Sequence, residues 1–437
     1  MTQVIDSEIN KFEHSRYRIK ARLVPNGASS EEEELDIGKA VSELFIYKNY
    51  DEQAFPYYRL TAMLSKVVAA RIYECWRDAK MYITLTRYIA VNDDQTNEEF
   101  TGDYYNNSIE FRIMVINGVP PPVQDGVQDD MAAARETLSV VLELAPSIPL
   151  EINRRILNGA FHDLKIIDLI ASLTSANKPK SDYRFLLSTT DNMKVYETIF
   201  LPPLNYVASL RHLDRVYGMY AGKLVVFLDL KFGYILSSTK ITVANGEVAT
   251  TTAVQHMAQS EAAMNNTGSG GSWFDYDSTT HHLRTFFPLQ IAVDGPARKE
   301  VGGEQIKLVN MSTEEHAGSV CKRLDADSVT PKEAGNSKER VVWQRYDNPL
   351  VVEKLRVESR ESYAPQVLMF SSCDLEAFQP NLQWIITSNV ETNKMFEGAW
   401  RISAMEAVLR KAPSTDETAS VEVKCVVVPS TATKAAT

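Results

Sequence analysis

Runs of alternating or β-branched residues dominate the first third of the chain. Val41–Tyr47 and Met81–Tyr88 are rich in β-branched and aromatic residues, and in Ser108–Ile116 the apolar residues fall at every second position, so all three predict strands. Another strand is expected near Phe55–Leu60, because proline is tolerated at a strand start. Apolar residues three or four positions apart over 67–76 predict a short helix. Strands around one short helix indicate a small β-barrel or sandwich.

The pattern becomes mixed between residues 131 and 241. Met131–Leu144 is expected as a helix with one apolar side, and Leu150–Ser175 as the longest helix of the chain. A third helix is expected at Leu204–Tyr220. The expected strands of this unit are Arg184–Ser188, Val195–Leu201 and Lys223–Ser237.

The next 90 or so residues carry a weaker pattern and are polar. Asn265–Ser272 has the composition of a flexible linker, and Asp325–Glu339 is expected as a mobile loop. Leu283–Val293 and Gln305–Val309 are candidate strands between them. The last unit is strand-rich again, with strands expected at Val351–Glu358, Val367–Ser371, Gln383–Ser388, Gly398–Val408 and Val421–Val428.

Composition shifts suggest where the units divide. Gly118–Pro122 contains three consecutive prolines, which halt a strand and favour extended backbone, so a domain boundary is expected there. The run Glu31–Glu34 repels itself and is expected in an exposed loop. The expected division is a peripheral segment (1–36), a first β domain (37–118), a mixed α+β domain (119–241), a linker-rich insertion with some strands (242–340), a last β domain (341–429) and a disordered tail (430–437).

Composition and charge narrow the class of protein. The 437 residues are 44% hydrophobic and 24% charged, which is typical of a chain that buries real cores. The net charge of −11 argues against a dedicated nucleic-acid-binding surface, although it suits a channel that repels phosphate. We find no apolar run long enough for a membrane span, and the N-terminus indicates a cytosolic start. Four widely spaced cysteines are expected as free thiols, with one long-range disulfide left open.

The search for reactive chemistry gives little. The glycine-rich stretch Gly268–Gly271 lacks the strand and helix that a phosphate-binding loop requires. His281 and His282 are adjacent, and neighbours on a strand point to opposite faces, which is a poor arrangement for one metal ion. We therefore expect no catalytic residue, no cofactor and no metal.

The most distinctive segment begins at Ile199–Tyr206. Its apolar run is expected to end as a strand at Leu201, and Pro202 and Pro203 to form a turn that removes ladder hydrogen bonds. Asn205 is expected to cap the next helix. In that helix Leu210, Leu213 and Tyr217 fall on one face, Gly218 loosens its end, and a buried strand returns through Val225 and Phe227.

This segment resembles the baseplate hub proteins of long-tailed bacteriophages, with the contractile kind favoured. The matching features are the strand into Pro202-Pro203, the helix with Leu213-Asp214 and Tyr217-Gly218-Met219-Tyr220, and the strand that ends at Asp229. Phe378–Trp384 and Phe396–Ile402 resemble the last domain of that family, and Tyr50-Asp51 with Phe55-Pro56 its first. Residues 250–340 match nothing in it.

The resemblance implies a β-rich α+β fold with two tube-like β-barrel or sandwich domains that flank or enclose a mixed α+β domain. It implies a structural virion protein with no enzymatic activity, three copies of which form a pseudo-sixfold ring. That ring would join the tail tube to the central spike and line the DNA channel, with tail tube, spike, tape measure and baseplate wedge proteins as partners. DNA would pass without specific binding, and no membrane anchor is implied. The chain would reside in the tail baseplate of the virion, and in the host cytoplasm during assembly.

The residues expected to determine structure and assembly are Pro202, Pro203, Asp214, Tyr217, Gly218 and Tyr220. Two alternatives stay open at this point. One is another baseplate component, such as a wedge or distal-tail protein, and the other is a soluble enzyme whose active site has no recognised motif.

Overall fold

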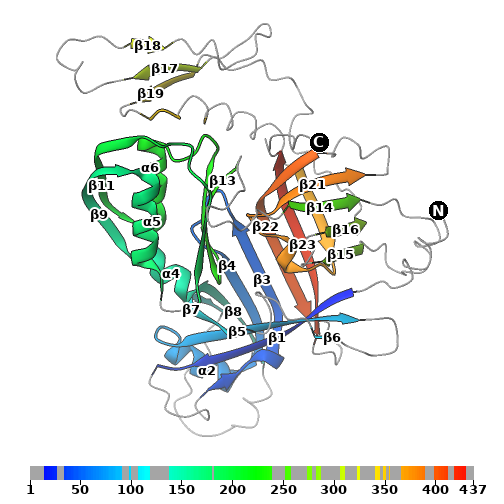
Figure 1. Ribbon diagram of the computed structural model, residues 1–437. Coiled ribbons are helices and arrows are strands. Elements are labelled where there is room, and N and C mark those ends of the chain that lie inside the picture. The colour runs from blue at the N-terminus through cyan, green and yellow to red at the C-terminus, as the bar shows by residue number, and fades with distance from the viewer. Residues whose placement is uncertain are drawn as a thin grey trace.

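The structure is a computed structural model in which two β-barrels and a mixed α+β domain are linked (Figure 1). It describes residues 14–26, 34–90, 98–99, 107–118, 137–179, 182–238, 348–350, 354, 366–388, 398–411 and 418–429, and the backbone of strands at 251–256, 273–277, 282–286, 306–310, 322–324 and 340–344. The predicted β-rich α+β class is confirmed.

Barrel 1 is a closed circle of antiparallel strands. Its hydrogen-bonded order is β22-β3-β4-β8-β7-β5-β1-β23, and β23 pairs again with β22, which closes the circle. The strands are β1 (His14–Val24), β3 (Val41–Asn49), β4 (Tyr57–Ser65), β5 (Lys80–Ala90), β7 (Ile109–Asn117), β8 (Thr137–Pro146), β22 (Gly398–Lys411) and β23 (Thr418–Pro429). A closed barrel leaves no sheet edge exposed for unwanted pairing.

The alternating pattern explains the interior of barrel 1. Leu44 and Ile46 of β3 and Leu60 of β4 point inward and are fully buried, while the residues between them are more exposed. Helix α2 (Lys66–Cys75) follows β4 directly and adds Ala69 and Ile72 to the same core. The predicted helix over 67–76 and the predicted strands of this region are confirmed.

Barrel 2 shares the long hairpin β22–β23 with barrel 1. The first residues of β22 pair with β21 (Gln383–Ser388), and a register shift between Ile402 and Ala404 separates this part from the part that pairs with β3. In the same way β23 pairs with β20 (Gln366–Ser371) and then, at its other end, with β1. A shift of this kind bends and twists a strand, so one hairpin can serve two barrels.

The rest of barrel 2 comes from the polar stretch in which the hydrophobic pattern is weak. β21 pairs with β14 (Thr251–His256), β14 with β16 (His282–Phe286), and β16 with β15 (Trp273–Asp277), which lies against β20. Trp384 fills the interior and packs against Phe370 and Phe378, with ring centroids 5.8 and 5.7 Å away. Three more strands, β17 (Ile306–Asn310), β18 (Lys322–Leu324) and β19 (Arg340–Gln344), form a separate small sheet.

The mixed domain follows β8. Its elements are α4 (Ser147–Arg154), β9 (Ile156–Lys165), α5 (Ile166–Asn177), β10 (Arg184–Leu187), β11 (Val195–Asn205), α6 (Tyr206–Tyr217), β12 (Leu224–Leu228) and β13 (Phe232–Ser237). β9 and β11 form an antiparallel ribbon, and β10, β13 and β12 a second sheet. In β12, Val225 and Phe227 join the barrel core while Leu224 and Val226 join the core around α5 and α6. This sheet is therefore buried on both faces and couples the domain to the barrels.

Several sequence predictions for the middle of the chain were wrong. Residues 137–144 of the expected helix Met131–Leu144 are strand β8, whose alternate residues Val140, Leu142 and Leu144 are buried. The expected long helix Leu150–Ser175 is interrupted by strand β9, and the expected strand Lys223–Ser237 is the hairpin β12–β13. Short apolar runs fit both the helical and the strand spacing of apolar residues. Pairing with strands that are distant in sequence decided between helix and strand.

Two further expectations about the ends of the units need correction. The segment 1–36 is not peripheral over residues 14–24, because β1 is a barrel strand with Tyr17, Ile19 and Leu23 buried. Lys354, inside the expected strand Val351–Glu358, is helical, with its amide donating to the carbonyl of Leu350 at 2.9 Å.

The predicted domain boundaries do not match the domains that the strand pairing defines. β8 lies beyond the predicted boundary at residue 118 and pairs with β4 and β7, and the predicted insertion supplies β14, β15 and β16 to barrel 2. The expected linker Asn265–Ser272, the loop Asp325–Glu339 and most of the glutamate run lie outside the described residues. Elsewhere, β2 (Leu35–Asp36) pairs with β1, and β6 (Glu98–Glu99) with β5.

Candidate functional site

Helix α6 begins as the sequence predicted. The side chain of Asn205 accepts a hydrogen bond from the amide of Ala208 at 2.8 Å, which satisfies one of the free amides of the first turn. Leu210 and Leu213 are fully buried on the inner face. The helix ends at Gly218, whose φ of +76° is a left-handed conformation that favours glycine.

Asp214 organises the chain beyond this helix end. Its Oδ1 accepts hydrogen bonds from the amides of Met219 at 3.1 Å and Tyr220 at 3.3 Å, and its Oδ2 pairs with the ammonium group of Lys354. The Asp214 side chain is buried, so these partners offset the cost of removing a carboxylate from water. One side chain thus joins α6, the following turn and a segment that is distant in sequence.

Gly218 sits directly under Asn348. A Cβ added at Gly218 would lie 2.1 Å from Oδ1 of Asn348, and the Asn348 amide group donates to the carbonyls of Asp214 and Arg215 at 3.3 and 3.2 Å. The position therefore requires glycine for two reasons, which are the backbone angle and the close approach of Asn348.

Tyr217 and Tyr220 fasten the same region to neighbouring strands. The hydroxyl of Tyr217 accepts from the amide of Phe200 at 2.7 Å, and its carbonyl accepts from the hydroxyl of Tyr196 at 2.8 Å. The hydroxyl of Tyr220 donates to the carbonyl of Ser188 at 3.0 Å, and burial raises the pKa of Tyr220 well above its usual value. Asp214, Tyr217, Gly218 and Tyr220 are therefore brought together, and we name them the α6 end cluster.

Pro202 and Pro203 lie apart from this cluster, and the predicted turn was wrong. β11 continues through both prolines to Asn205, with a register shift against β9 between Leu201 and Leu204. Prolines have no amide hydrogen to donate. At a bulge the ladder of hydrogen bonds is already interrupted, so prolines can lie there within a strand. They lie where β11 passes into the start of α6.

A second cluster lies at the junction of all three parts, and the sequence did not identify it. It centres on residues 48–55, which we name the joint segment. Lys48 pairs with Asp229 of the mixed domain at 2.6 Å, and both side chains are almost fully buried. Tyr50 donates from its hydroxyl to the carbonyl of Phe378 at 2.6 Å, and its ring meets Phe227 edge-on at 4.8 Å.

Asp51 holds the joint segment to the shared hairpin. Its carboxylate receives both terminal nitrogens of Arg401 at 2.8 and 3.1 Å, the hydroxyl of Ser403 at 2.8 Å and the ammonium group of Lys223 at 3.1 Å. Burial alone would raise the pKa of Asp51, but the charge and hydrogen bonds of Arg401, with Lys223 and Ser403, hold this pKa below its usual value. The aspartate therefore stays ionised inside the protein.

The joint segment also reaches α6. Arg211 donates to the carbonyls of Glu52 and Gln53 at 2.9 and 3.1 Å, and the amide of Leu228 donates to the carbonyl of Ala54 at 2.8 Å. The sequence offered one signal, since Asp51 and Asp229 each follow an apolar strand. Their partners lie up to 350 positions away and gave no local signal.

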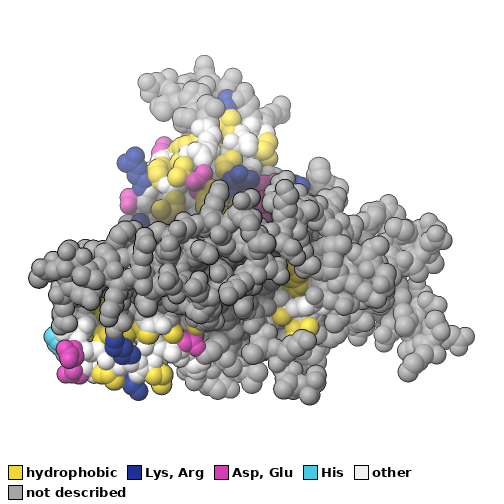
Figure 2. Space-filling view, turned by 90° about the horizontal axis from the view of Figure 1, so that it is seen from above, with side chains coloured by type: hydrophobic (Ala, Val, Ile, Leu, Met, Phe, Trp, Pro, Cys, Tyr) yellow, Lys and Arg dark blue, Asp and Glu magenta, His cyan; other side chains and the backbone are white. Residues whose placement is uncertain are grey.

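Reactive groups are sparse in the described part of the chain. Within it we find no group of three or more His, Cys, Asp or Glu side chains that could hold a metal ion. Cys75, Cys373 and Cys425 are free thiols, and burial raises the pKa of Cys373 well above its usual value. None of the described helices combines the length and apolar character needed to span a bilayer. Seen from above, the described side chains mix hydrophobic, basic and acidic groups (Figure 2).

Two barrels that share a hairpin, joined to a mixed domain, define a fold found in other proteins. A chain of the lidded PdpA–VgrG complex of Francisella has this fold, with a TM-score of 0.50, 9% identity, and alignment over 95% of this chain and 53% of that one. This chain thus spans about half the length of that relative. The 43 kDa tail protein of prophage MuSo2 from Shewanella oneidensis (TM-score 0.45, 8% identity, 94% of this chain and 99% of that one) is also similar. The tail protein of Neisseria meningitidis MC58 is similar as well, with a TM-score of 0.45, 8% identity, and alignment over 94% of this chain and 96% of that one.

The sequence itself identifies the family. No curated protein matches the chain. The model of the family described as Bacteriophage PBS1 gene 109 protein matches residues 8–427, so the chain belongs to this family. The expected relationship to bacteriophage proteins is therefore confirmed.

Proposed function

We propose that this chain is a structural subunit of the tail baseplate hub, three copies of which form a pseudo-sixfold ring. The observation that carries the proposal is the presence of two barrels in one chain, the first closed by hydrogen bonds and the second with its end strands β15 and β20 lying against each other. Three such chains place six barrels around an axis, which matches a sixfold tail tube on one side and a threefold central spike on the other. The ring adapts one symmetry to the other without making or breaking a covalent bond.

Rigid coupling between the barrels supports this role. The hairpin β22–β23 runs through both barrels, and the ion pairs Lys48–Asp229 and Asp51–Lys223 connect them to the mixed domain. A ring that transmits load along a tail requires its parts to keep fixed positions. Buried pairs of this kind are costly to break, because loss of one partner leaves an uncompensated charge.

The acidic balance of the chain supports a channel through which DNA passes without being held. A net charge of −11 opposes the phosphate contacts that dominate nucleic-acid affinity. Within this proposal the partners are the tail tube ring, the central spike, the tape measure protein and the baseplate wedge. The chain acts in the virion, after assembly in the host cytoplasm.

We also propose that Pro202, Pro203 and the α6 end cluster are structural determinants, with no part in catalysis. The hydrogen bonds of Asp214, Tyr217 and Tyr220 support this role, because each ends on a backbone group or another structural side chain. Their task is to fix the direction in which the chain leaves α6 and enters β12.

The oligomeric mass tests the proposed ring. Light scattering on the purified chain should give a trimer at three times 49.1 kDa, which is about 147 kDa. A hexamer of identical chains would favour a distal-tail component, and a monomer at every concentration would contradict the hub.

A further inference from the structure

A lysine occupies the inward row of a barrel strand. At the end of β3 and directly after it, the buried positions are Leu44, Ile46, Lys48 and Tyr50. Lysine is almost never fully buried in a protein without a partner. Here the partner is Asp229, in the turn between β12 and β13. Apolar residues of similar volume often stabilise a core as well as a buried ion pair does, so stability alone does not account for this pair.

The pair is also drier than the other lysine–carboxylate pairs of the described residues. The exposed fractions of the Lys48 and Asp229 side chains are 2% and 6%. In the corresponding pairs of Lys354, Lys223 and Lys80, the lysine side chain is 15%, 35% and 42% exposed. Exclusion of water removes the hydration shell that keeps an ammonium group and a carboxylate unreactive toward each other.

The atoms around Asp229 are arranged for a reaction as well as for an ion pair. Nζ of Lys48 lies 2.6 Å from Oδ2, and because a carbon–oxygen bond is short, it lies roughly 3–4 Å from Cγ, close to the separation of reacting atoms. The amide of Leu230 donates to Oδ1 at 2.9 Å, so negative charge that develops on this oxygen already has a donor.

A tyrosine hydroxyl completes these surroundings. The hydroxyl of Tyr183 is buried and has no hydrogen-bond partner among the described residues. Burial and the nearby charge of Asp229 raise the pKa of Tyr183 well above its usual value, so the hydroxyl keeps its proton and remains a donor. A neutral donor next to a carboxylate can solvate the oxygen that leaves when the carboxylate reacts.

We propose that Lys48 and Asp229 join through an amide bond once the chain has folded. Nζ passes one proton to Oδ2, the resulting amine attacks Cγ, and Oδ2 then leaves as water with a second proton from Nζ. Of the three hydrogens of the ammonium group, one stays on the amide nitrogen and two leave with the water. The condensation needs no oxidant, metal or further reactant, because both reacting groups belong to this chain.

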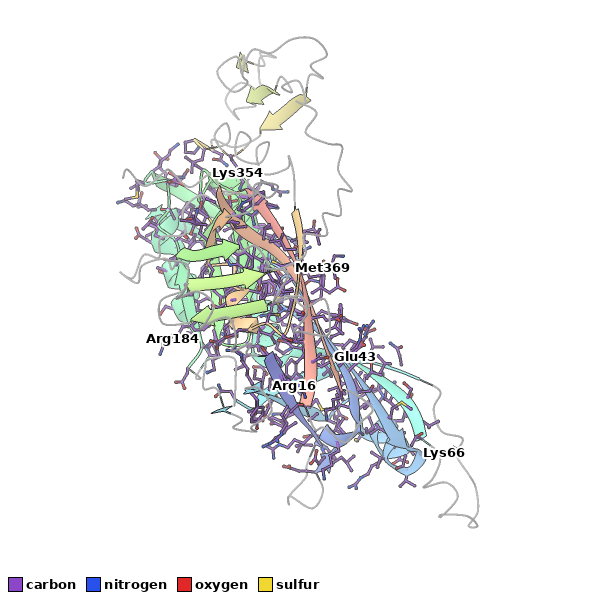
Figure 3. The ribbon with its side chains drawn as sticks, turned by 90° about the vertical axis from the view of Figure 1, so that its right-hand side faces the viewer. Arg16, Glu43, Lys66, Arg184, Lys354 and Met369 are labelled. Carbon is purple, nitrogen blue, oxygen red and sulfur yellow. The ribbon has the colours of Figure 1, made fainter. Side chains whose placement is uncertain are left out.

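The bond joins two parts of the molecule across 181 positions of the sequence. In Figure 3, Glu43 lies on the same strand as Lys48, and Arg184, which follows Tyr183, begins β10 of the mixed domain. An amide, unlike an ion pair, does not separate when the salt concentration or the pH changes. It therefore keeps barrel 1 attached to the mixed domain under load, and it also restricts the unfolded chain.

Mass spectrometry of the intact, denatured chain tests the bond. The folded wild-type protein should yield a chain lighter than its sequence by one water molecule, and a digest should contain the Lys48 and Asp229 peptides joined by an amide. Lys80 and Glu110, which pair at 3.0 Å with a lysine that is 42% exposed, should stay unlinked and serve as the internal control. A wild-type chain of full mass, purified from folded protein, would overturn the proposal and leave the oligomeric ring untouched, because light scattering tests the ring separately.

Two variants distinguish the amide from the ion pair. Lys48→Arg keeps a cation opposite Asp229, but a guanidinium group stays protonated and is no nucleophile, so this variant should fold and keep its full mass. Asp229→Asn should form the same amide and lose one ammonia molecule instead of water. Circular dichroism checks the folding of both. Loss of water from folded Lys48→Arg would place the dehydration elsewhere in the chain and overturn the proposal, and if this variant does not fold, the joined peptide in the wild-type digest decides.

Discussion

At the scale of single residues, the Asp51 carboxylate contacts groups from two parts of the molecule at once. Arg401 and Ser403 belong to the shared hairpin and Lys223 to the mixed domain. The pKa of Asp51 is lowered in the folded protein, so its ionised form stabilises the fold. That stabilisation is present above the unfolded pKa of about 3.8 and is lost as the pH falls through the lower folded pKa.

Replacing Asp51 tests this directly. Asp51→Asn should lower the free energy of unfolding at pH 7 by about 3–5 kcal/mol, because it leaves buried cations without their counter-charge. The loss of stability below pH 3.8 should be smaller in the variant than in the wild type. Urea denaturation at pH 7 and pH 3 measures both, with the exposed Asp78→Asn as control. An unchanged pH profile in Asp51→Asn would contradict the role assigned to this carboxylate.

Gly218 is the second position at which one residue decides the local structure. Gly218→Ala should cost about 1–3 kcal/mol, from the left-handed backbone and the contact with Asn348. Gly398→Ala is the matched control, since its φ of +139° is also unfavourable but nothing lies within 4 Å of the added Cβ. Denaturant unfolding compares the two. If the two losses are equal, the contact with Asn348 contributes nothing.

At the scale of elements, β11 and α6 act as one unit held at both ends. Asn205 and the proline bulge fix the start of the helix, and Tyr217 returns to the amide of Phe200 in the strand. Pro203→Ala combined with Tyr217→Ala should lower stability by roughly 2 kcal/mol and reduce the yield of folded protein. Tyr217→Phe is the control that keeps the ring against Tyr196 and removes the hydroxyl. Normal stability and yield in the double variant would contradict the proposed structural role of this segment.

The sequence predicted local features of the elements better than their partners. The cap at Asn205, the glycine end of α6 and strands β3, β4, β5 and β7 of barrel 1 depend on neighbouring residues, and these expectations were confirmed. Residues 137–144 were assigned to a helix because Leu138, Val141 and Leu142 also fit a helical spacing. These residues form a strand because they pair with β4 and β7, which lie elsewhere in the chain and leave no signal in the local pattern.

The joint segment was missed for a related reason. Lys48 and Asp229 are 181 positions apart, and Asp51 and Arg401 are 350 apart. No local pattern distinguishes a buried lysine or arginine from an exposed one until the partner strand is in place. The α6 end cluster was found because its members lie within one short motif, although Asn348 and Lys354 were not foreseen.

At the scale of the whole molecule, the shared hairpin is the feature that makes two barrels behave as one piece. β22 pairs with β21 along its first residues and with β3 along its later ones, so it contributes a strand to each barrel. The joint segment then fixes the mixed domain against this pair through the buried ion pair Lys48–Asp229, while Asp51 binds Arg401 of the hairpin. A chain built in this way can supply two adjacent positions of a ring at a constant spacing.

Electron-microscopy class averaging of the purified trimer tests the central claim most directly. End-on views should contain a ring of six similar lobes, two from each of three chains, with threefold symmetry when the lobes are compared in detail. A trimer whose averages have three lobes, or whose barrels do not form a closed ring, would contradict the account.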